Sequence, residues 1–303
     1  MLPDNRSHGK YGLVIAMSNK LLQILFLQQL KGIGPAKINS KYNKALRMSS
    51  DINEIADQVS DSNTYSQIPL AKENAMRLMD SILSDETIKA ITVLDAEYPE
   101  ALKALGDKRP VVIYAQGNAD LLSKTSVSVV GTRKPSDQTI RATLSMAERI
   151  SKRGILVVSG LAEGTDTHAH MGALKEQGGT IAVLPSGFNR IYPKQNTGLA
   201  TKIVASGCLV SEYTPDAASN KFTFVRRDSL IAALSRGTII MECGVKSGTM
   251  HTANAAFEMH RLLGCYLPEN RGESFAGNEL IINSLKGIEI IKHSDLEGFC
   301  DRL

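Results

Sequence analysis

The sequence predicts an α/β protein with a doubly wound, mostly parallel sheet preceded by a small helical domain. Short, continuously apolar segments such as T-I-A-V-L at 180–184 and T-I-I-M at 238–241 are typical of strands buried on both faces. Helical stretches alternate with these segments, which is the pattern of a doubly wound sheet. Before about residue 83 the apolar periodicity is helical instead.

Length and composition describe an ordinary globular chain. Of the 303 residues, 43% are hydrophobic and 22% are charged. No apolar run approaches the roughly 18 residues of a membrane-spanning helix, so we expect no membrane association and a cytoplasmic location. The four cysteines form no C-x-x-C pair, which indicates reduced, buried thiols and neither a zinc site nor disulfides. A net charge of +4 permits a nucleic-acid partner without requiring one.

The predicted N-terminal domain, residues 1–85, is helical and resembles a helix-hairpin-helix or SAM-like unit. Its first 12 or so residues are polar and are expected to fray, and Ser18 is expected to cap the first helix. The following K-G-I-G-P-A-K predicts a tight turn in which Gly32 and Gly34 take positive φ and Pro35 starts the next helix. The turn's amides suit a phosphate, but a purely structural turn explains the pattern equally well.

The second domain is predicted to cover residues 86–303. A first strand is expected at 91–94, and the tail after Ile291 is expected to close this domain. Further strands are predicted at 111–115, 126–131, 155–159, 180–184, 208–212, 237–242 and 263–267.

The first strand–turn–helix segment, S-V-S-V-V-G-T-R-K-P-S at 126–136, indicates phosphate recognition. A strand that runs into a glycine-bearing turn and a helix presents backbone N–H groups to an anion. The dinucleotide fingerprint G-x-G-x-x-G is missing, and the cations Arg133 and Lys134 follow Thr132 in its place. We therefore expect phosphate binding without NAD or another cofactor.

Three further predicted turns at the same sheet edge carry glycines, hydroxyls and cations. They contain Ser159, Gly160 and Gly164; Ser186 and Gly187; and the run from Lys246 through Ser247 and Gly248 to Thr249. Because ligands collect at the carboxyl ends of parallel strands, we expect Gly160 and Gly248 to contact the ligand, the alternative being simple turn geometry.

Several catalytic and metal motifs are disfavoured. G-V-K-S-G-T at 244–249 has the wrong spacing for a P-loop, and Ser247 does not lie in a G-x-S-x-G elbow. His168 and His170 are two residues apart on a helix expected to be capped by Thr165 or Asp166, so they should not share a metal. Both are expected to satisfy local hydrogen bonds.

Carboxylates near the strand ends are expected to orient basic side chains instead of catalysing a reaction. This set consists of Glu163, Asp166, Glu212 and Glu242.

The densest basic and aromatic cluster is K-F-T-F-V-R-R-D at 221–228, at the start of a predicted helix. Arginine can fork onto phosphate oxygens while a phenylalanine stacks on an exposed base, which together favour single-strand binding. The alternative is a solvated basic loop with core phenylalanines. Phe188, Phe222 and Phe224 are the candidate stacking residues.

An ordered series of motifs resembles the DNA-processing protein A family, also called DprA or Smf. The likeness runs from about residue 95 to 288, and the N-terminal G-I-G turn is similar to that family's leading domain. The motifs are D-A-E-Y-P at 95–99, V-V-G-T-R at 129–133, S-G-L-A at 159–162 with His168 and His170, I-Y-P-K-Q-N at 191–196 and S-G-T-M-H-T-A at 247–253.

The resemblance implies an extended Rossmann domain that binds single-stranded DNA as a homodimer and helps to load the RecA recombinase during uptake of transforming DNA. The family's DNA-contacting residues match Arg133, Lys221 and Phe224. Lys194, in the 191–196 motif, belongs to the same candidate set.

The chain departs from the family in its arginine-rich helix. Where the family has F-P-x-R-N-R, this chain has F-V-R-R-D-S at 224–229, with Asp228 for asparagine and Ser229 for the second arginine. Arg227 is kept, and Arg226 is expected to compensate in part. Since each neutralised phosphate adds to affinity, we expect weaker binding to a polyanion. With no C-terminal winged helix expected, the pattern fits a divergent branch, serving mobile-element or defence functions instead of transformation.

The preferred hypothesis is a non-enzymatic, single-stranded DNA-binding protein with no metal. Its pocket is expected to hold phosphates through Arg133, Lys221, Arg227 and the amides around Gly160 and Gly248. The complete candidate set is Thr132, Arg133, Lys134, Gly160, Lys194, Lys221, Phe224, Arg226, Arg227, Ser247, Gly248 and Thr249.

Two alternatives stay open at this point. Related Rossmann enzymes similar to the phosphoribohydrolases use P-G-G-x-G-T-x-x-E, and Thr252 stands where that glutamate would fall. A sensor of a small nucleotide signal would use the same pocket.

Overall fold

The structure is a computed structural model, and it describes residues 19–49, 51–61, 64–176 and 179–303. The chain forms two compact units, Met1–Tyr98 with Leu105–Ile113 and Pro99–Ala104 with Tyr114–Leu303. The change from helices to strands falls between Leu83 and Ile88, but the first strand belongs to the first unit because helix α5 packs against it. The division into 1–85 and 86–303 stays a prediction.

The first unit is mainly helical. A helix covers residues 19–29 and buries Ile24, Leu25 and Leu27; the expected Ser18 cap and the first 12 residues lie outside the described residues. The turn after it has Gly32 at φ +80° and Pro35 at a helix start, as predicted, whereas Gly34 has φ −105° and the prediction of positive φ was wrong there. The helices that follow are α2 (Pro35–Lys37), η1 (Ile38–Tyr42), α3 (Asn43–Met48), α4 (Ile52–Val59), η2 (Tyr65–Gln67) and α5 (Ile68–Leu83).

The strands form a nine-stranded sheet in the order β1-β2-β6-β5-β4-β3-β7-β8-β9. From β6 to β9 neighbouring strands are parallel, and β2 pairs antiparallel with β6 through Tyr114 opposite Ser211. Every residue of β3 and β5 is buried, as expected for strands covered on both faces. The strands are β1 (Ile88–Thr92), β2 (Val112–Gly117), β3 (Ser126–Val130), β4 (Leu156–Ser159), β5 (Thr180–Leu184), β6 (Cys208–Ser211), β7 (Gly237–Ile240), β8 (Leu262–Tyr266) and β9 (Ile288–Ile290).

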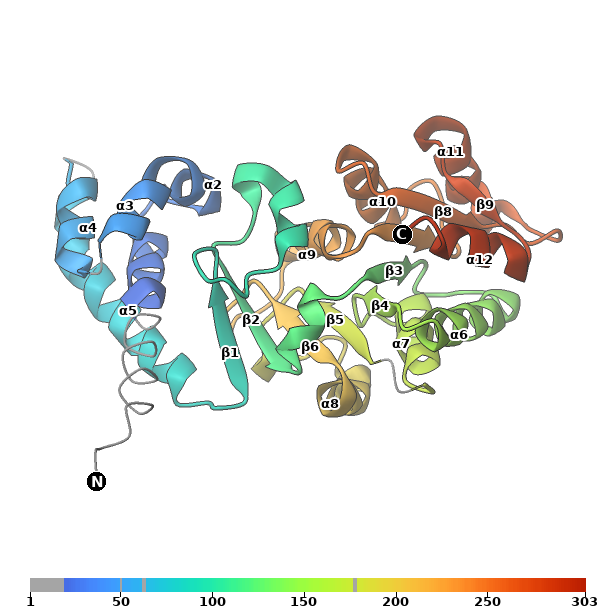
Figure 1. Cartoon of the computed structure of the whole chain (residues 1–303), viewed down its shortest axis with the longest axis horizontal. Coiled ribbons are helices and arrows are strands. Elements are labelled where there is room, and N and C mark those ends of the chain that lie inside the picture. Colours follow the sequence, from blue (N-terminus) through green and yellow to red (C-terminus); the bar gives the residue numbers. More distant parts are fainter. Residues whose placement is uncertain (1–18, 50, 62–63, 177–178) are drawn as a thin grey trace, which may run out of the picture. The chain divides into compact units, whose positions relative to one another are not determined.

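Helices of the second unit cover both faces of the sheet (Figure 1). One face carries α6 (Asp137–Lys152), α7 (Thr165–Ala173) and α8 (Thr197–Ser206), and the other carries α9 (Lys221–Leu234), α10 (Thr249–Glu258) and α11 (Ala276–Leu285). The doubly wound, mostly parallel α/β fold with a helical N-terminal region is therefore confirmed. Short 3₁₀ helices η3 (Glu100–Lys108), η4 (Ala119–Ser123), η5 (Phe188–Arg190), η6 (Lys194–Asn196) and η7 (Glu273–Phe275) lie in the connections.

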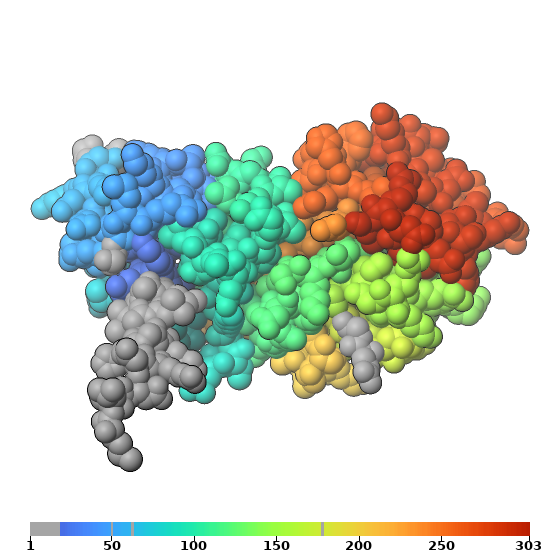
Figure 2. Space-filling view, in the orientation of Figure 1, coloured from blue at the N-terminus to red at the C-terminus, as the bar shows by residue number. Residues whose placement is uncertain are grey.

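The C-terminal segment packs onto the sheet, as the sequence predicted for the tail. Helix α12 (His293–Cys300) buries Leu296 and Phe299 in the main core, and a Cβ on Gly237 or Gly264 would lie 2.9 Å from the Phe299 ring. These strand glycines therefore make room for the ring. On the surface, the red C-terminal segment adjoins the green segment that contains α6 (Figure 2).

Strand β9 is a finding that sequence analysis did not predict, because it has only three residues and no apolar run. All four cysteines are free and buried, as expected. Within the described residues, no helix is long and apolar enough to cross a membrane.

Candidate nucleic-acid interface

A pocket of about 560 Å³ opens at the carboxyl edge of the sheet in the second unit. Its walls come from the turn after β3, from α9 and from the start of α10. Most of the predicted site residues meet here: Thr132, Arg133, Lys134, Lys221, Phe224, Arg227, Ser247, Gly248 and Thr249.

The turn after β3 is fixed by backbone hydrogen bonds to two other segments, and its basic side chains lie on the surface. The Thr132 amide donates to the Glu242 carbonyl at 2.7 Å, and the Thr132 carbonyl accepts from the Thr165 amide at 3.1 Å and hydroxyl at 3.0 Å. Arg133 and Lys134 follow immediately and are exposed. Exposed, unburied cations on a fixed turn are suited to neutralising an anion.

The N-terminus of α9 contributes the next part of the rim. Asn220 caps the helix by accepting from the Phe222 amide at 2.9 Å and the Thr223 amide at 3.2 Å, and Thr223 completes a capping box. Lys221, the first helical residue, is exposed at the pocket mouth.

Phe224 has two cations and a second aromatic ring as neighbours. The guanidinium carbons of Arg133 and Arg227 lie 5.6 and 5.8 Å from the ring centroid, both within cation–π range. The Tyr192 ring meets Phe224 edge to face at 5.4 Å. The other candidate stacking residues differ: Phe188 is buried, and Phe222 is 72% exposed but does not line the pocket.

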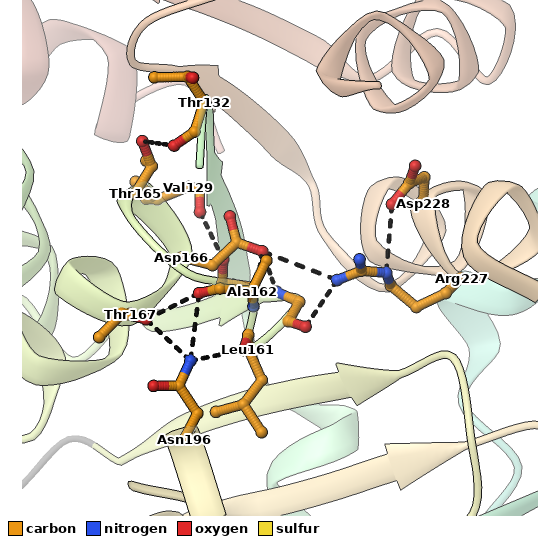
Figure 3. A network of polar contacts seen from close by, with 12 residues as sticks. Val129, Thr132, Leu161, Ala162, Thr165, Asp166, Thr167, Asn196, Arg227 and Asp228 are labelled. Atoms are coloured by element: carbon orange, nitrogen blue, oxygen red, sulfur yellow. Dashed lines mark hydrogen bonds and ion pairs between the residues drawn. The ribbon is translucent and has the colours of Figure 1, made fainter. Parts of the chain in front are cut away.

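Arg227 lies beneath this rim at the centre of a buried charge network (Figure 3). Its Nη1 donates to the Gly160 carbonyl at 2.7 Å and lies 3.7 Å from the Asp166 carboxylate. Its Nε lies 3.2 Å from the Asp228 carboxylate, and the residue is only 5% exposed. Two carboxylates therefore share one buried guanidinium.

Burial shifts the proton affinity of both acids. It raises the pKa of Asp166, although Arg227 and the Gly160 and Ala162 amides oppose the shift. It also raises the pKa of Asp228 to about 6, opposed by the charge of Arg227 and reinforced by that of Asp166. The pocket floor is thus less negative at mildly acid pH than at neutral pH.

Gly160 has a different role from the one the sequence suggested. A Cβ at this position would lie 1.3 Å from Arg227 Nη1, so only glycine leaves room for the guanidinium. The Gly160 amide already donates to Asp166 at 3.1 Å and is buried, which leaves that amide unable to face a phosphate. By contrast, a Cβ on Gly248 would meet nothing within 4 Å, so packing does not require glycine there.

Arg226 and Lys194 also lie outside the pocket. Arg226 points to Glu212, with its Nε 2.7 Å from one carboxylate oxygen and 3.1 Å from the other. Burial raises the pKa of Glu212, while Arg226 opposes the shift by charge and hydrogen bonding. Lys194 lines a neighbouring groove.

The acids behave largely as orienting groups. Asp166 and Glu212 contact Arg227 and Arg226, and the Glu242 carboxylate accepts from the Ser136 amide and hydroxyl at 3.0 Å each. Burial alone would raise the pKa of Glu242, but hydrogen bonds from its neighbours together lower it.

The two histidines make separate local contacts, as predicted. His168 Nδ1 lies 2.7 Å from the Gly164 carbonyl, and His170 Nδ1 lies 2.9 Å from the Thr180 hydroxyl. Burial lowers the pKa of His170 to about 3. The N-cap of α7 is Gly164, so the prediction of Thr165 or Asp166 as the cap was wrong by one or two residues. Among the described residues, no group of three or more His, Cys, Asp or Glu side chains is placed to hold a metal.

Sequence reasoning missed two residues of this region. His251 lines the pocket, and Tyr192 supports Phe224. His251 lies in the motif 247–253 and Tyr192 in the motif 191–196, and membership of these motifs is the sequence signal that could have identified them.

A doubly wound sheet with Arg133, Lys221 and Phe224 at a pocket on its carboxyl edge defines a Rossmann-like protein. The model of the family DNA recombination-mediator protein A matches residues 89–295, and the chain belongs to that family.

Individual relatives agree with this assignment. The DNA processing protein DprA of Bacillus subtilis is 35% identical over 178 residues, which span 58% of this chain and 60% of the relative. The crystal structure of DprA from Streptococcus pneumoniae superposes with a TM-score of 0.77 at 30% identity, covering 91% of this chain and 96% of that one.

DNA processing protein A of Helicobacter pylori, whose structure describes a single-stranded DNA binding mode, gives a TM-score of 0.62 at 27% identity. That match covers 71% of this chain and 94% of that one.

Proposed function

We propose that this chain binds single-stranded DNA through the pocket at the carboxyl edge of the sheet. The observation that carries the proposal is Phe224, an aromatic ring within cation–π range of Arg133 and Arg227, with Lys221 at the same mouth. Aromatic faces for bases and cations for phosphates are the two components of single-strand binding. The single-stranded DNA binding described for the H. pylori relative supports the same ligand class.

The residues at the rim of the pocket are suited mainly to contacts with the phosphates of the DNA. Arg133, Lys134 and Lys221 are exposed, and the start of α10 adds the hydroxyls of Ser247 and Thr249. Phosphate contacts carry little sequence information, so affinity should depend strongly on salt and weakly on base sequence.

We further propose that the chain catalyses no reaction. We also propose that it forms a homodimer and that it promotes loading of the RecA recombinase. Membership in a family of recombination mediators supports a role in handing DNA to a recombinase. Thr252, which replaces the glutamate of the phosphoribohydrolase motif, is buried in the pocket wall and supplies no carboxylate. Sizing by light scattering and a RecA filament-assembly assay test the two partner proposals.

A double substitution tests the binding site. Arg133→Ala with Lys221→Ala should weaken binding to an oligothymidylate more than about a hundredfold at moderate salt, since charge-assisted hydrogen bonds contribute roughly 1.5–3 kcal/mol each. The slope of log affinity against log salt should also become shallower by about 0.7 for each lost phosphate contact. Fluorescence anisotropy measures both quantities.

The matched control removes one arginine and one lysine elsewhere on the same unit. Arg149→Ala with Lys202→Ala changes exposed residues of α6 and α8 that do not line the pocket. Equal losses in the two double variants would show general electrostatics instead of a site. Release of free base from nucleoside monophosphates by the wild-type chain would support an enzyme instead.

A further inference from the structure

A second hollow, here called the side groove, lies at the same edge of the second unit. It has a volume of about 730 Å³ and is formed by the loops that follow β5 and β6. It is lined by Phe188, Asn189, Arg190, Ile191, Tyr192, Lys194, Thr197, Asp216, Ala218 and Ser219.

The side groove repeats the chemistry of the main pocket. Tyr192 is 44% exposed, and Arg190 and Lys194 are both exposed. Within the described part of the chain, neither cation makes an ion pair, and the acid Asp216 accepts a hydrogen bond from Asn189 at 2.9 Å. An accessible ring next to two unpaired cations is again suited to one base and its flanking phosphates.

A shared aromatic ridge joins the two hollows. Tyr192 lines the side groove, Phe224 lines the main pocket, and their rings meet edge to face at 5.4 Å and 78°. A bound DNA strand that leaves the main pocket across Phe224 therefore reaches Tyr192 next.

The side groove is held in shape by backbone and amide hydrogen bonds. The buried Asn196 amide donates to the Leu161 carbonyl at 2.8 Å and to the Thr167 hydroxyl at 2.9 Å, which ties this segment to the turn after β4. On the other side, the Gly187 amide donates to the Ala217 carbonyl at 2.9 Å. A preformed groove costs little ordering free energy when a ligand binds.

We propose that the side groove is a second nucleotide subsite for single-stranded DNA, in which Tyr192 stacks on a base and Arg190 and Lys194 contact phosphates. This inference rests on the proposed function and extends it from one nucleotide pocket to a continuous path of two hollows. The main pocket alone accommodates a very short oligonucleotide, whereas a longer strand occupies both.

Oligonucleotide length separates the two subsites. Arg190→Gln with Lys194→Gln, which leaves the Tyr192–Phe224 contact intact, should weaken binding of an oligothymidylate of about ten residues at least tenfold, from two lost phosphate contacts. The same variant should change the affinity for a thymidine dinucleotide by less than about twofold, because the main pocket keeps Phe224 and its cations. Anisotropy titrations of both ligands give the comparison.

The control is Arg149→Gln with Lys202→Gln, which removes two exposed cations that line neither hollow. Equal weakening of the short and the long ligand would mean that Arg190 and Lys194 act on the main pocket and not on a separate site, and it would overturn the subsite. Unchanged binding of the long ligand would also overturn it while leaving the proposed function intact. Failure of the wild-type chain to bind either ligand would instead remove the proposed function.

Discussion

The rim and the floor of the main pocket both carry basic side chains, but only the floor pairs its basic side chain with carboxylates. At the rim, Arg133 and Lys221 are exposed, and their cation–π contacts leave the positive charge uncancelled. On the floor, Arg227 is 5% exposed and shared between Asp166 and Asp228. The comparison teaches that a cation's role follows from its burial and partners: the rim is suited to recruiting a polyanion, and the floor holds the fold of the site.

The floor also explains why the glycine turn after β4 has its sequence. Gly160 leaves space for the Arg227 guanidinium and accepts its hydrogen bond, while Asp166 accepts from the Gly160 amide. A buried charge that loses its partner is expensive, so these groups are mutually dependent.

Substituting the central floor residue should have the largest effect. Arg227→Met leaves two buried carboxylates without their cation and should lower the free energy of unfolding by about 3–5 kcal/mol. Urea denaturation followed by circular dichroism measures the loss. Arg133→Ala at the rim should change the same quantity by less than about 0.5 kcal/mol.

A double variant tests the cause of this loss. If uncompensated charge is responsible, Arg227→Met with Asp228→Asn should be more stable than Arg227→Met alone. A double variant that is no more stable, or a single variant as stable as the wild type, would contradict the view of the floor as a coupled charge network.

An intermediate effect is expected from the acid that faces the ligand space. Asp228 lines the pocket, and burial raises the pKa of its carboxyl to about 6. A bound phosphate favours the protonated form and raises this pKa further, so binding takes up a proton and affinity rises as pH falls toward about 6. The rise is at most about tenfold per pH unit and levels off below the pKa of the unliganded protein.

Asp228→Asn should remove this pH dependence and strengthen binding at neutral pH by roughly fivefold, since a like charge near a phosphate costs about 1 kcal/mol even in bulk water. The charged groups that face Asp228 are Arg227, Asp166, His251 and Arg133. His251 is one of these neighbours, so the titration is repeated with His251→Asn. A pH profile that Asp228→Asn does not alter would rule out the carboxyl as its source.

Much of this arrangement could be predicted from sequence, and the remainder depends on spatial contacts. The strand T-I-A-V-L was predicted with the bounds that β5 has, because a fully buried strand has a continuous apolar pattern. The three-residue β9 has no such pattern and depends on pairing with β8. Similarly, glycine-rich turns located the pocket, but no local pattern shows that Arg227 occupies the space at Gly160, 67 positions away.

Adjacent residues on α9 illustrate the same limit. Arg226 and Arg227 are the same residue type at adjacent positions, so the sequence does not distinguish them, and both were predicted to contact DNA. The helix directs Arg227 to the floor and Arg226 to Glu212, outside the pocket.

The smallest effect is therefore expected for Arg226. Arg226→Gln with Glu212→Gln removes a carboxylate-paired cation together with its partner, so the local charge is conserved and no buried ion is left unpaired. Affinity for an oligothymidylate should stay within about twofold of the wild type, with an unchanged salt slope, because Arg226 would neutralise no phosphate. Anisotropy across a salt series measures both. A shallower slope would show that Arg226 leaves Glu212 to contact DNA. Arg226 would then belong to neither group of cations, because it would be paired with an acid in the free protein and with phosphate in the complex.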